Sequence, residues 1–291
     1  MRVNTGKIIH SCICTIILNR PFVIDIGCAK GTWALNYAKR HSDVNVLGLE
    51  IRRPVVEFAL KRKVRWGLRN VHFLSCNANV DLDRILSTIT GIDPQKKNNN
   101  PSIELLEKNR NKNKVFNKES EIDDEENDLD NDDNVENDYE ETMKAYNDFL
   151  VSNLQQPIDF QSATCGSSSL FKINYNNNSN DRSYIKLVTL QFPDPHFKTK
   201  HKKRRVMNDE LVQTITKHIQ PMTPIFVQSD ILEVLEDIVE TLSSSVHITP
   251  SSEYNIKHLN ENKNMVGIPT EREIATLAKN LPVYRMLFYK K

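Results

Sequence analysis

Short apolar segments alternate in this chain with segments of helical periodicity, and no other feature constrains the fold as much. Between the apolar segments, hydrophobic residues recur three and four positions apart, as in helices that bury one face. Segments predicted as strands are 22–26, 44–50, 71–76, 184–192, 224–229, 246–249 and 283–289. Segments predicted as helices are 32–41, 54–64, 80–89, 208–219 and 230–242, and a last helix follows Thr270. Asn208 is the expected cap of the helix 208–219, and Asp230 with Glu233 has the spacing of a capping box at the start of the helix 230–242. Strands that alternate with helices form βαβ units, so the sequence predicts an α/β fold with a largely parallel sheet.

Charge is distributed very unevenly along the chain. The net charge of all 291 residues is only +1, yet every charged residue from Glu119 to Glu141 is acidic. Those fourteen acidic residues mask a charge of +15 on the rest of the chain. A remainder as basic as this favours nucleic acid or another polyanion as the partner.

Residues 91–182 differ in composition from the rest of the chain. They contain runs of asparagine, the acidic block and a serine patch, with few apolar residues. Such a segment cannot bury enough apolar surface to offset the entropy lost on ordering, so we predict a low-complexity, disordered insertion. The insertion would divide one domain into two parts, 21–90 and 183–291. Residues 1–20 fit no known pattern, and we expect a divergent or truncated N-terminal segment there.

Neither a metal site nor a membrane span is expected. The five cysteines include no Cys-X-X-Cys pair, and the eight histidines do not cluster at the spacing of metal ligands. The apolar stretch 8–18 is interrupted by polar residues and is much shorter than the roughly 20 residues that cross a bilayer. An odd number of cysteines also argues against a disulfide framework and for a reducing compartment. The nucleus or the cytoplasm is favoured, and a plastid-type organelle is left open.

The first predicted strand runs into a glycine turn that contains Gly27, Ala29 and Gly31. Glycine lets the backbone approach a ligand closely, and the helix that follows presents free amide groups. Glu50 ends the next strand, 23 residues after Gly27, where a carboxylate can accept hydrogen bonds from both hydroxyls of a ribose. The pattern fits a nucleoside-containing cofactor, and an ordinary carboxylate at a strand end fits it equally well.

Asn77 closes the third predicted strand. Its amide could read the edge of an adenine, although a simple asparagine turn is the commoner role. The glycine turn lacks the third glycine that packs a pyrophosphate-binding helix, and no arginine is placed to bind a 2′-phosphate. S-adenosylmethionine has a ribose and an adenine but no phosphate, and it therefore fits better than NAD.

The segment LQFPDPHFKTKHKKRRV, from Leu190 to Val206, joins a strand end to a basic run. Prolines on both sides of Asp194 restrict the backbone and place its carboxylate at the end of a strand, where open α/β sheets bind ligands. Six lysines and arginines follow within eleven residues, a density suited to phosphates. These features predict a polyanionic substrate with its reacting atom near Asp194. A proline-stopped strand followed by a solvated basic run is the alternative.

Taken together, these motifs resemble those of one known family. DIGCAKG, GLEIRRP, LRNVHFLSCNA, FPDPHFKTKHKKRR, FVQSD and GIPTEREI occur in the order and style of the tRNA (guanine-N7)-methyltransferases, and the sequence is most similar to their bacterial and plant branch. The resemblance covers about residues 21–79 and 184–291. It implies a class I, Rossmann-like methyltransferase sheet with one antiparallel late strand. It also implies transfer of a methyl group from S-adenosylmethionine to N7 of a guanine in the variable loop of tRNA.

The resemblance implies roles for single residues, with the cofactor half of the domain at 21–90 and the catalytic half at 183–291. The residues that match the cofactor site are Asp25, Gly27, Glu50, Ile51, Asn77 and Ala78. The residue that matches the reaction centre is Asp194, and those that match the substrate site are Lys198, Asp230, Thr270 and Glu273. Phosphate contacts are expected from Arg52, Arg53, Lys200, His201, Lys202, Lys203, Arg204 and Arg205. Asp25 and Asn77 depart from the family pattern, since many members carry glutamate and aspartate there.

Methylation of guanine N7 needs no strong base, because that atom has an exposed lone pair. The reaction moves positive charge onto the purine ring, and a fixed carboxylate such as Asp194 would stabilise and orient the base as that charge develops. The pair of Thr270 and Glu273 has a second interpretation, as a capping box at the start of a helix, and the two roles are compatible.

Two other functions stay open at this point: a non-catalytic RNA-binding module on the same fold, and a methyltransferase that acts on another substrate. The presence of Asp194, Glu50 and the TEREI motif argues against the first, and the basic charge argues against the second. The expected partner is tRNA. Nuclear members of the family work with a non-catalytic WD-repeat subunit and bacterial members act alone, and the sequence does not decide between these arrangements.

Overall fold

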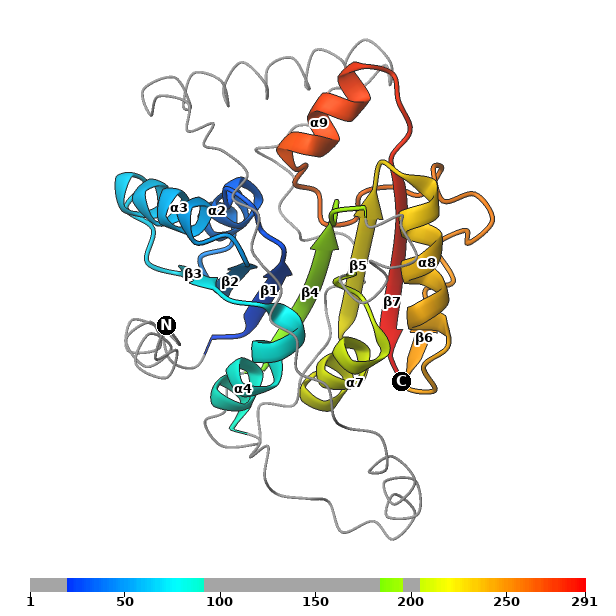
Figure 1. Ribbon diagram of the computed structural model, residues 1–291, viewed down its shortest axis with the longest axis horizontal. Helices are drawn as coiled ribbons and strands as arrows, with labels where there is room; N and C mark the ends of the chain where they lie inside the picture. Colours follow the sequence, from blue (N-terminus) through cyan, green and yellow to red (C-terminus); the bar gives the residue numbers. More distant parts are fainter. Residues whose placement is uncertain (1–19, 92–183, 196–204) are drawn as a thin grey trace, which may run out of the picture.

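The structure is a computed structural model, and it describes residues 20–91, 184–195 and 205–291. In these ranges, seven strands form one sheet with helices on both sides (Figure 1). The strands are β1 (Phe22–Ile26), β2 (Asn45–Glu50), β3 (Val71–Ser75), β4 (Ile185–Gln191), β5 (Pro224–Ser229), β6 (Ile248–Pro250) and β7 (Tyr284–Lys290). The helices are α2 (Thr32–Arg40), α3 (Arg53–Arg65), α4 (Ala78–Thr90), α7 (Asp209–His218), α8 (Leu232–Ser243) and α9 (Glu271–Ala278).

The strands lie in the order β3-β2-β1-β4-β5-β7-β6. Adjacent strands from β3 to β5 are parallel, whereas β7 is antiparallel to both of its neighbours, β5 and β6. The predicted α/β class, with a mostly parallel sheet and an antiparallel late strand, is therefore confirmed. All the predicted strands are present with nearly the expected bounds, because strands that are buried on both faces consist of continuous apolar runs.

The strand order changes direction at the centre of the sheet. From β1 the chain moves outward through β2 to β3, and it then returns to the other side of β1 to form β4 and β5. Because such crossovers are right-handed, α2 and α3 lie on one face and α4 and α7 on the other, where α7 packs against α4 and α8 (Figure 1). The carboxyl ends of β1 and β4 lie side by side at this switch point, which is where open α/β sheets bind ligands.

The hydrophobic core runs through the sheet and both helical layers. Its largest fully buried side chains include Phe226 on β5 and Phe288 on β7. Trp33 is buried on α2, as expected for a core tryptophan, and Trp66 is partly buried against the same core. His72 lies on the edge strand β3 and is buried, and burial lowers the pKa of its imidazole to about 4.

The helix starts agree with the sequence prediction at α7 and differ from it at α8. Asn208 caps α7, as predicted, by accepting a hydrogen bond from the amide three residues later at 2.8 Å. The prediction that Asp230 and Glu233 form a capping box for α8 is wrong. The N-cap residue of α8 is Ile231, and the Asp230 carboxylate binds Arg272 in α9 instead. An ion pair with a distant element replaces the local cap.

Two of the predicted segments lie almost entirely outside the described residues. They are the N-terminal segment 1–20, apart from its last residue, and the insertion 91–182, apart from Gly91. Within the part of the chain that the structure describes, no helix has the length and apolar character that a membrane span requires.

Candidate active site at the carboxyl edge of the sheet

A cavity of about 340 Å³ opens at the carboxyl ends of β1 and β4. Its lining comes from both halves of the domain, which meet at this point. The residues of the first half include Asp25, Gly27 and Thr32, and those of the second half include Asp194, Asp230 and Thr270. The cavity thus lies at the switch point that the strand order defines.

The glycine turn after β1 forms one wall of the cavity. Gly27 has a φ of 75°, in the left-handed region that favours glycine, and a Cβ added there would meet no atom within 4 Å. Gly31 has a φ of 74°, and a Cβ there would lie 2.6 Å from the ring of Phe73. Gly27 therefore leaves open space beside the turn, while Gly31 lets α2 pack closely on the sheet.

Glu50 ends β2 beside this turn, and its side chain is only 7% exposed. The carboxylate accepts hydrogen bonds from the backbone amides of Ala29, at 3.2 Å, and Arg52, at 3.0 Å. The Nε of Arg52 also donates to it, at 3.2 Å. These donors hold the carboxylate at the rim of the glycine turn, the position predicted for an acid that binds ribose hydroxyls. Ile51, the next residue, is 65% exposed.

Asn77 follows β3, and α4 begins directly after it at Ala78, two residues earlier than predicted. The side-chain oxygen of Asn77 accepts a hydrogen bond from the amide of Asn79 at 3.1 Å, so Asn77 caps α4. The interpretation of Asn77 as a turn residue is confirmed. An adenine contact would have to come from the amide nitrogen of the same side chain.

Asp25 lies near the end of β1 and is only 3% exposed. Its carboxyl accepts hydrogen bonds from Thr189 Oγ1, at 2.7 Å, and from Gln191 Nε2, at 3.4 Å. Burial raises the pKa of this carboxyl to about 7; the two hydrogen bonds oppose that rise, and the charge of Glu50 adds to it. The Asp25 carboxylate would therefore be stabilised by a cationic group in the cavity.

Asp194 lines the cavity, three residues beyond the end of β4. The backbone that leads to it is constrained. Phe192 has a φ of 51°, which is unusual for a residue other than glycine, and Pro193 and Pro195 restrict the positions on either side of Asp194. The side chain is exposed, so a ligand can reach it. Asp194 and Gly27 line the same cavity.

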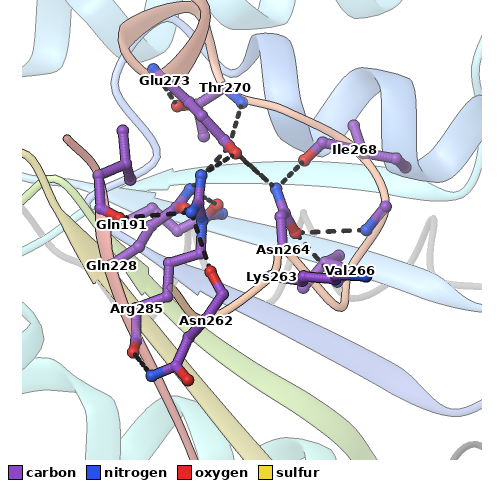
Figure 2. Close-up of polar contacts among 12 residues, drawn as sticks. Gln191, Gln228, Asn262, Lys263, Asn264, Val266, Ile268, Thr270, Glu273 and Arg285 are labelled. Atoms are coloured by element: carbon purple, nitrogen blue, oxygen red, sulfur yellow. Dashed lines mark hydrogen bonds and ion pairs between the residues drawn. The ribbon is translucent and has the colours of Figure 1, made fainter. Parts of the chain in front are cut away.

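Thr270 is the N-cap residue of α9, and Glu273 is the third residue of that helix. The Thr270 hydroxyl accepts a hydrogen bond from the Glu273 amide at 3.0 Å, and the Glu273 carboxylate accepts one from the Thr270 amide at 3.4 Å (Figure 2). The capping-box interpretation is confirmed. Thr270 lines the cavity, whereas Glu273 is fully buried. This position does not support direct contact between Glu273 and a substrate.

Two further contacts hold the first turn of α9 at the cavity. Arg272 pairs with Asp230 at 2.6 Å, which joins α9 to the loop after β5. Glu271 accepts a hydrogen bond from Thr32 Oγ1 at 2.7 Å, which joins α9 to the start of α2. Thr32 in turn accepts a hydrogen bond from the buried Arg62 of α3 at 2.5 Å. Asp230, a predicted substrate residue, thus lies at the cavity within an ion pair.

Three of the predicted phosphate contacts fall in the described ranges, and each has an acidic neighbour. Arg52 contacts the carboxylate at the end of β2, and Arg53 pairs with Glu57 at 2.8 Å. Arg205 pairs with Asp237 of α8. The predicted contacts that lie outside the described residues are Lys198, Lys200, His201, Lys202, Lys203 and Arg204.

The structure brings polar residues to this region that the sequence analysis missed. Gln191, Gln228 and Arg285 lie on the neighbouring strands β4, β5 and β7 and are linked by hydrogen bonds. Each is a polar residue within an apolar strand, and that interruption is the signal that could have identified it. Thr32 and Arg272 give no such signal, because polar residues are common in the first turn of a helix.

The chemistry of the cavity and of the strand end beside it fits S-adenosylmethionine. Of the predicted cofactor residues, Asp25 and Gly27 line the cavity, whereas Glu50, Ile51, Asn77 and Ala78 lie outside its lining. The acid at the end of β2 suits a ribose, the open side of the glycine turn suits close approach, and Asp25 suits a cationic group such as the sulfonium or the amino group. Within 20–91, 184–195 and 205–291, no three His, Cys, Asp or Glu side chains are grouped so that they could hold a metal ion.

Comparison with known proteins decides the family. The family model described as "Putative methyltransferase" matches residues 19–92 and 174–286, which is more than half of the chain. The chain belongs to this methyltransferase family. A tRNA (guanine-N(7)-)-methyltransferase of Prochlorococcus marinus is 26% identical over 270 residues, or 93% of this chain and 83% of that protein. The protein of the same name from Synechococcus elongatus is 27% identical over 274 residues, or 94% of this chain and 83% of that protein.

These matches confirm the family resemblance that the motifs indicate. As a member of a methyltransferase family the protein is an enzyme, and S-adenosylmethionine is its methyl donor. The alternative of a non-catalytic module on the same fold is therefore set aside.

The chain also matches solved structures of methyltransferases. The precorrin-6y C5,15-methyltransferase of Geobacter metallireducens GS-15 is 9% identical, with a TM-score of 0.40 over 99% of this chain and 90% of that chain. The aminoglycoside resistance methyltransferase NpmB1 is 13% identical, with a TM-score of 0.40 over 100% of this chain and 95% of that chain. These TM-scores are too low to assign the fold, which is defined by the strand order.

Proposed function

We propose that this protein transfers a methyl group from S-adenosylmethionine to N7 of a guanine in the variable loop of tRNA. The observation that carries the proposal is the position of Asp194, which is held between two prolines and lines one cavity with the glycine turn of β1. The relatives named above and the charge of +15 outside the acidic block support tRNA as the substrate.

Six residues are assigned to the cofactor. They are Asp25, Gly27, Glu50, Ile51, Asn77 and Ala78. When bound, S-adenosylmethionine supplies the methyl group from its sulfonium centre. The Glu50 carboxylate, oriented by the amide donors of the turn, accepts hydrogen bonds from the ribose hydroxyls. The Asp25 carboxyl lies beneath the turn and ionises more readily when a cation is nearby.

Asp194 is assigned to the reacting guanine. The N7 lone pair is exposed, so no proton has to leave that atom before it attacks the methyl carbon. Positive charge develops on the purine ring as the new bond forms. A carboxylate on a constrained backbone stabilises that charge without reorganising, and it also orients the base. Alignment of N7 with the methyl group contributes further to the rate.

The basic segment and the start of α9 are assigned to the tRNA. Residues assigned to phosphates are Arg52, Arg53, Lys198, Lys200, His201, Lys202, Lys203 and Arg204. All three described arginines have an acidic partner, but the side chain of Arg205 is only 28% exposed, whereas those of Arg52 and Arg53 are 61% and 73% exposed. We therefore assign Arg205 to anchoring the basic segment through Asp237 rather than to a phosphate. Thr270 and Asp230 line the cavity and are assigned to the nucleotide that enters it.

We further propose that the chain acts without a WD-repeat subunit, because the relatives named above are bacterial. The purified chain should therefore be active alone. We also propose that residues 91–182 are an insertion outside the catalytic domain. The gap between the two segments that match the family model, 19–92 and 174–286, supports this division.

Labelling of tRNA tests the proposed function. Purified protein is incubated with unmodified tRNA and methyl-labelled S-adenosylmethionine, and the RNA is then cleaved chemically at 7-methylguanosine. We expect incorporation of the label and cleavage in the variable loop. A matched tRNA with 7-deazaguanosine at that position has carbon in place of N7 and should stay unlabelled. Label at another atom, or no label in the unmodified tRNA, would refute the proposed reaction.

A further inference from the structure

Arg285 lies within β7 and forms the centre of a buried polar network (Figure 2). Its guanidinium pairs with the Glu273 carboxylate at 2.8 Å, and the two side chains are only 9% and 1% exposed. Removing two charges from water is costly, and a well-packed apolar pair is often as stable as a buried ion pair. Stability alone therefore does not explain why these two charges lie in the core.

Four acceptors hold the Arg285 guanidinium in one orientation. Its Nε donates to Gln228 Oε1 at 3.2 Å, and its Nη2 donates to Glu273 at 2.8 Å. Its Nη1 donates to the backbone carbonyls of Asn262 and Val283, at 3.1 and 3.3 Å. Because a guanidinium is planar and rigid, these contacts fix the positions of β5, β7 and α9 relative to one another.

Glu273 transmits this constraint to the start of α9. Its carboxylate accepts hydrogen bonds from Asn264 Nδ2 at 2.9 Å and from Gln228 Nε2 at 3.2 Å. It also accepts the bond from the Thr270 amide that completes the capping box. The location of Thr270 is therefore set by side chains inside the sheet.

Apart from the polar contacts of Glu271 with Thr32 and of Arg272 with Asp230, helix α9 has few contacts among the described residues that hold it in place. It is eight residues long, and Ile274 is its only fully buried apolar side chain. Figure 1 shows the helix above the carboxyl edge of the sheet. Its start nevertheless supplies Thr270, Glu271 and Arg272 to the cavity lining. A short helix with so small an apolar face depends on other contacts for its position.

We propose that Arg285 is a positioning residue that fixes the start of α9 through Glu273, so that Thr270 and Arg272 meet the tRNA. This role rests on the proposed function. Glu273 then acts within the protein as the link between Arg285 and the capping box. Direct contact of Glu273 with the RNA, which the family resemblance implies, is the competing role.

The variant Arg285→Met tests the role, because it removes the guanidinium and keeps an apolar chain of similar length. We expect the KM for tRNA to rise at least about tenfold, which corresponds to roughly 1.4 kcal/mol of lost interaction. The affinity for S-adenosylmethionine should change less than about threefold, since the network reaches Asp25 only through the 3.4 Å contact with Gln191. Partial unfolding would instead weaken the binding of tRNA and of S-adenosylmethionine to a similar extent.

Hydrogen exchange gives a readout that does not depend on the substrate. In the protein alone, the backbone amides of residues 270–274 should exchange at least about tenfold faster in Arg285→Met than in the wild type. Arg285→Lys keeps the charge but offers fewer donors in a less rigid arrangement, so it should restore only part of the protection and of the tRNA affinity.

A double variant covers the case in which Arg285→Met fails to fold because it leaves Glu273 buried without its cation. Glu273→Gln combined with Arg285→Met removes both charges, and glutamine at this helix position still completes a capping box. The double variant should fold and show the tRNA KM of the single variant. The matched control is Asp83→Asn, which removes the charge from a 2.7 Å contact with His218 between α4 and α7. It should lower stability and leave the tRNA KM unchanged.

The proposal is overturned if Arg285→Met and the double variant show the tRNA KM of the Asp83→Asn control, or if cofactor affinity falls in parallel. It is also overturned if Glu273→Gln alone loses tRNA affinity while Arg285→Met keeps it, because Glu273 would then contact the RNA itself. Absence of tRNA methylation by the wild type would count against the proposed function alone. The exchange rates at residues 270–274 would still test the positioning of α9.

Discussion

Among single residues, Asp25 and Asp83 have pKa values shifted in opposite directions, so their contributions to folding stability should change with pH in opposite directions. Burial raises the pKa of the Asp25 carboxyl to about 7. Burial also disfavours the ionised form of Asp83, but hydrogen bonds from Lys217 and His218 outweigh that effect and lower its pKa. Asp25 lines the cavity, and its ionised form is unfavourable until a cationic ligand binds there. Asp83 joins two helices, and its ionised form stabilises the fold.

The pH dependence of stability tests both shifts. Between about pH 4 and pH 7 the folded protein retains the Asp25 proton that the unfolded chain has lost, so the contribution of Asp25 falls as pH rises through this window. Without cofactor, Asp25→Asn should therefore have a higher urea midpoint than the wild type at about pH 8. The contribution of Asp83 is present above its unfolded pKa and is lost as pH falls, so Asp83→Asn should have a lower midpoint at about pH 8 and approach the wild type in acid. A lower midpoint for Asp25→Asn at the higher pH would contradict the assignment.

Among the elements, those with a local cause could be predicted from the sequence. Continuous apolar runs locate the parallel strands, and local caps at Asn208 and Thr270 locate the starts of α7 and α9. The start of α8 could not be predicted, because Asp230 binds Arg272, 42 residues away. The network around Arg285 could not be predicted from the sequence for the same reason, because it joins side chains from separate strands and a helix.

The cap of α9 supports a prediction at this scale. Thr270→Ala removes the oxygen that accepts a hydrogen bond from the Glu273 amide, and loss of an N-cap costs about 1 kcal/mol. Because this cap lies on the cavity wall, the KM for tRNA should also rise. Thr270→Ser keeps the oxygen and should resemble the wild type in both respects. Thermal unfolding and steady-state methylation measure the two effects, and equal KM values for the alanine and serine variants would argue against a role at the site.

Over the whole molecule, the two faces of the sheet differ in charge. On one face, α3 contains five basic residues and one acidic residue. On the other, α8 contains four acidic residues and no basic residue. The electrostatic field that results from this difference in charge would direct a polyanion toward the face that carries α3 and toward the end of β2.

Salt dependence tests this electrostatic contribution. The logarithm of tRNA affinity should fall linearly with the logarithm of salt concentration, with a slope steeper than about −3, because each neutralised phosphate releases counterions. Arg53→Gln should make the slope shallower by about one. Glu236→Gln, which removes a charge from the exposed surface of α8, is the matched control and should leave the slope unchanged. An affinity that does not depend on salt would exclude phosphate contacts as its main source.

The insertion supports a second prediction at this scale. Helix α4 runs from the carboxyl edge back to the amino edge, where β4 begins, so its last residue and the first residue of β4 lie at the edge opposite the cavity. Replacing residues 92–183 with a short Gly-Ser linker should therefore keep tRNA methylation within a few-fold of the wild type. Complete loss of activity in a folded deletion variant would place part of the active site in that segment.

The most direct test of the proposed chemistry is single-turnover methylation of tRNA by Asp194→Ala, measured together with its affinities for tRNA and S-adenosylmethionine. We expect the methylation rate to fall at least about a hundredfold, because the charge that develops on the guanine is no longer stabilised. Both affinities should stay close to those of the wild type, since other residues provide the binding. Asp194→Asn, which keeps the shape and loses the charge, should also be slow. A wild-type rate in Asp194→Ala would contradict the role of this carboxylate.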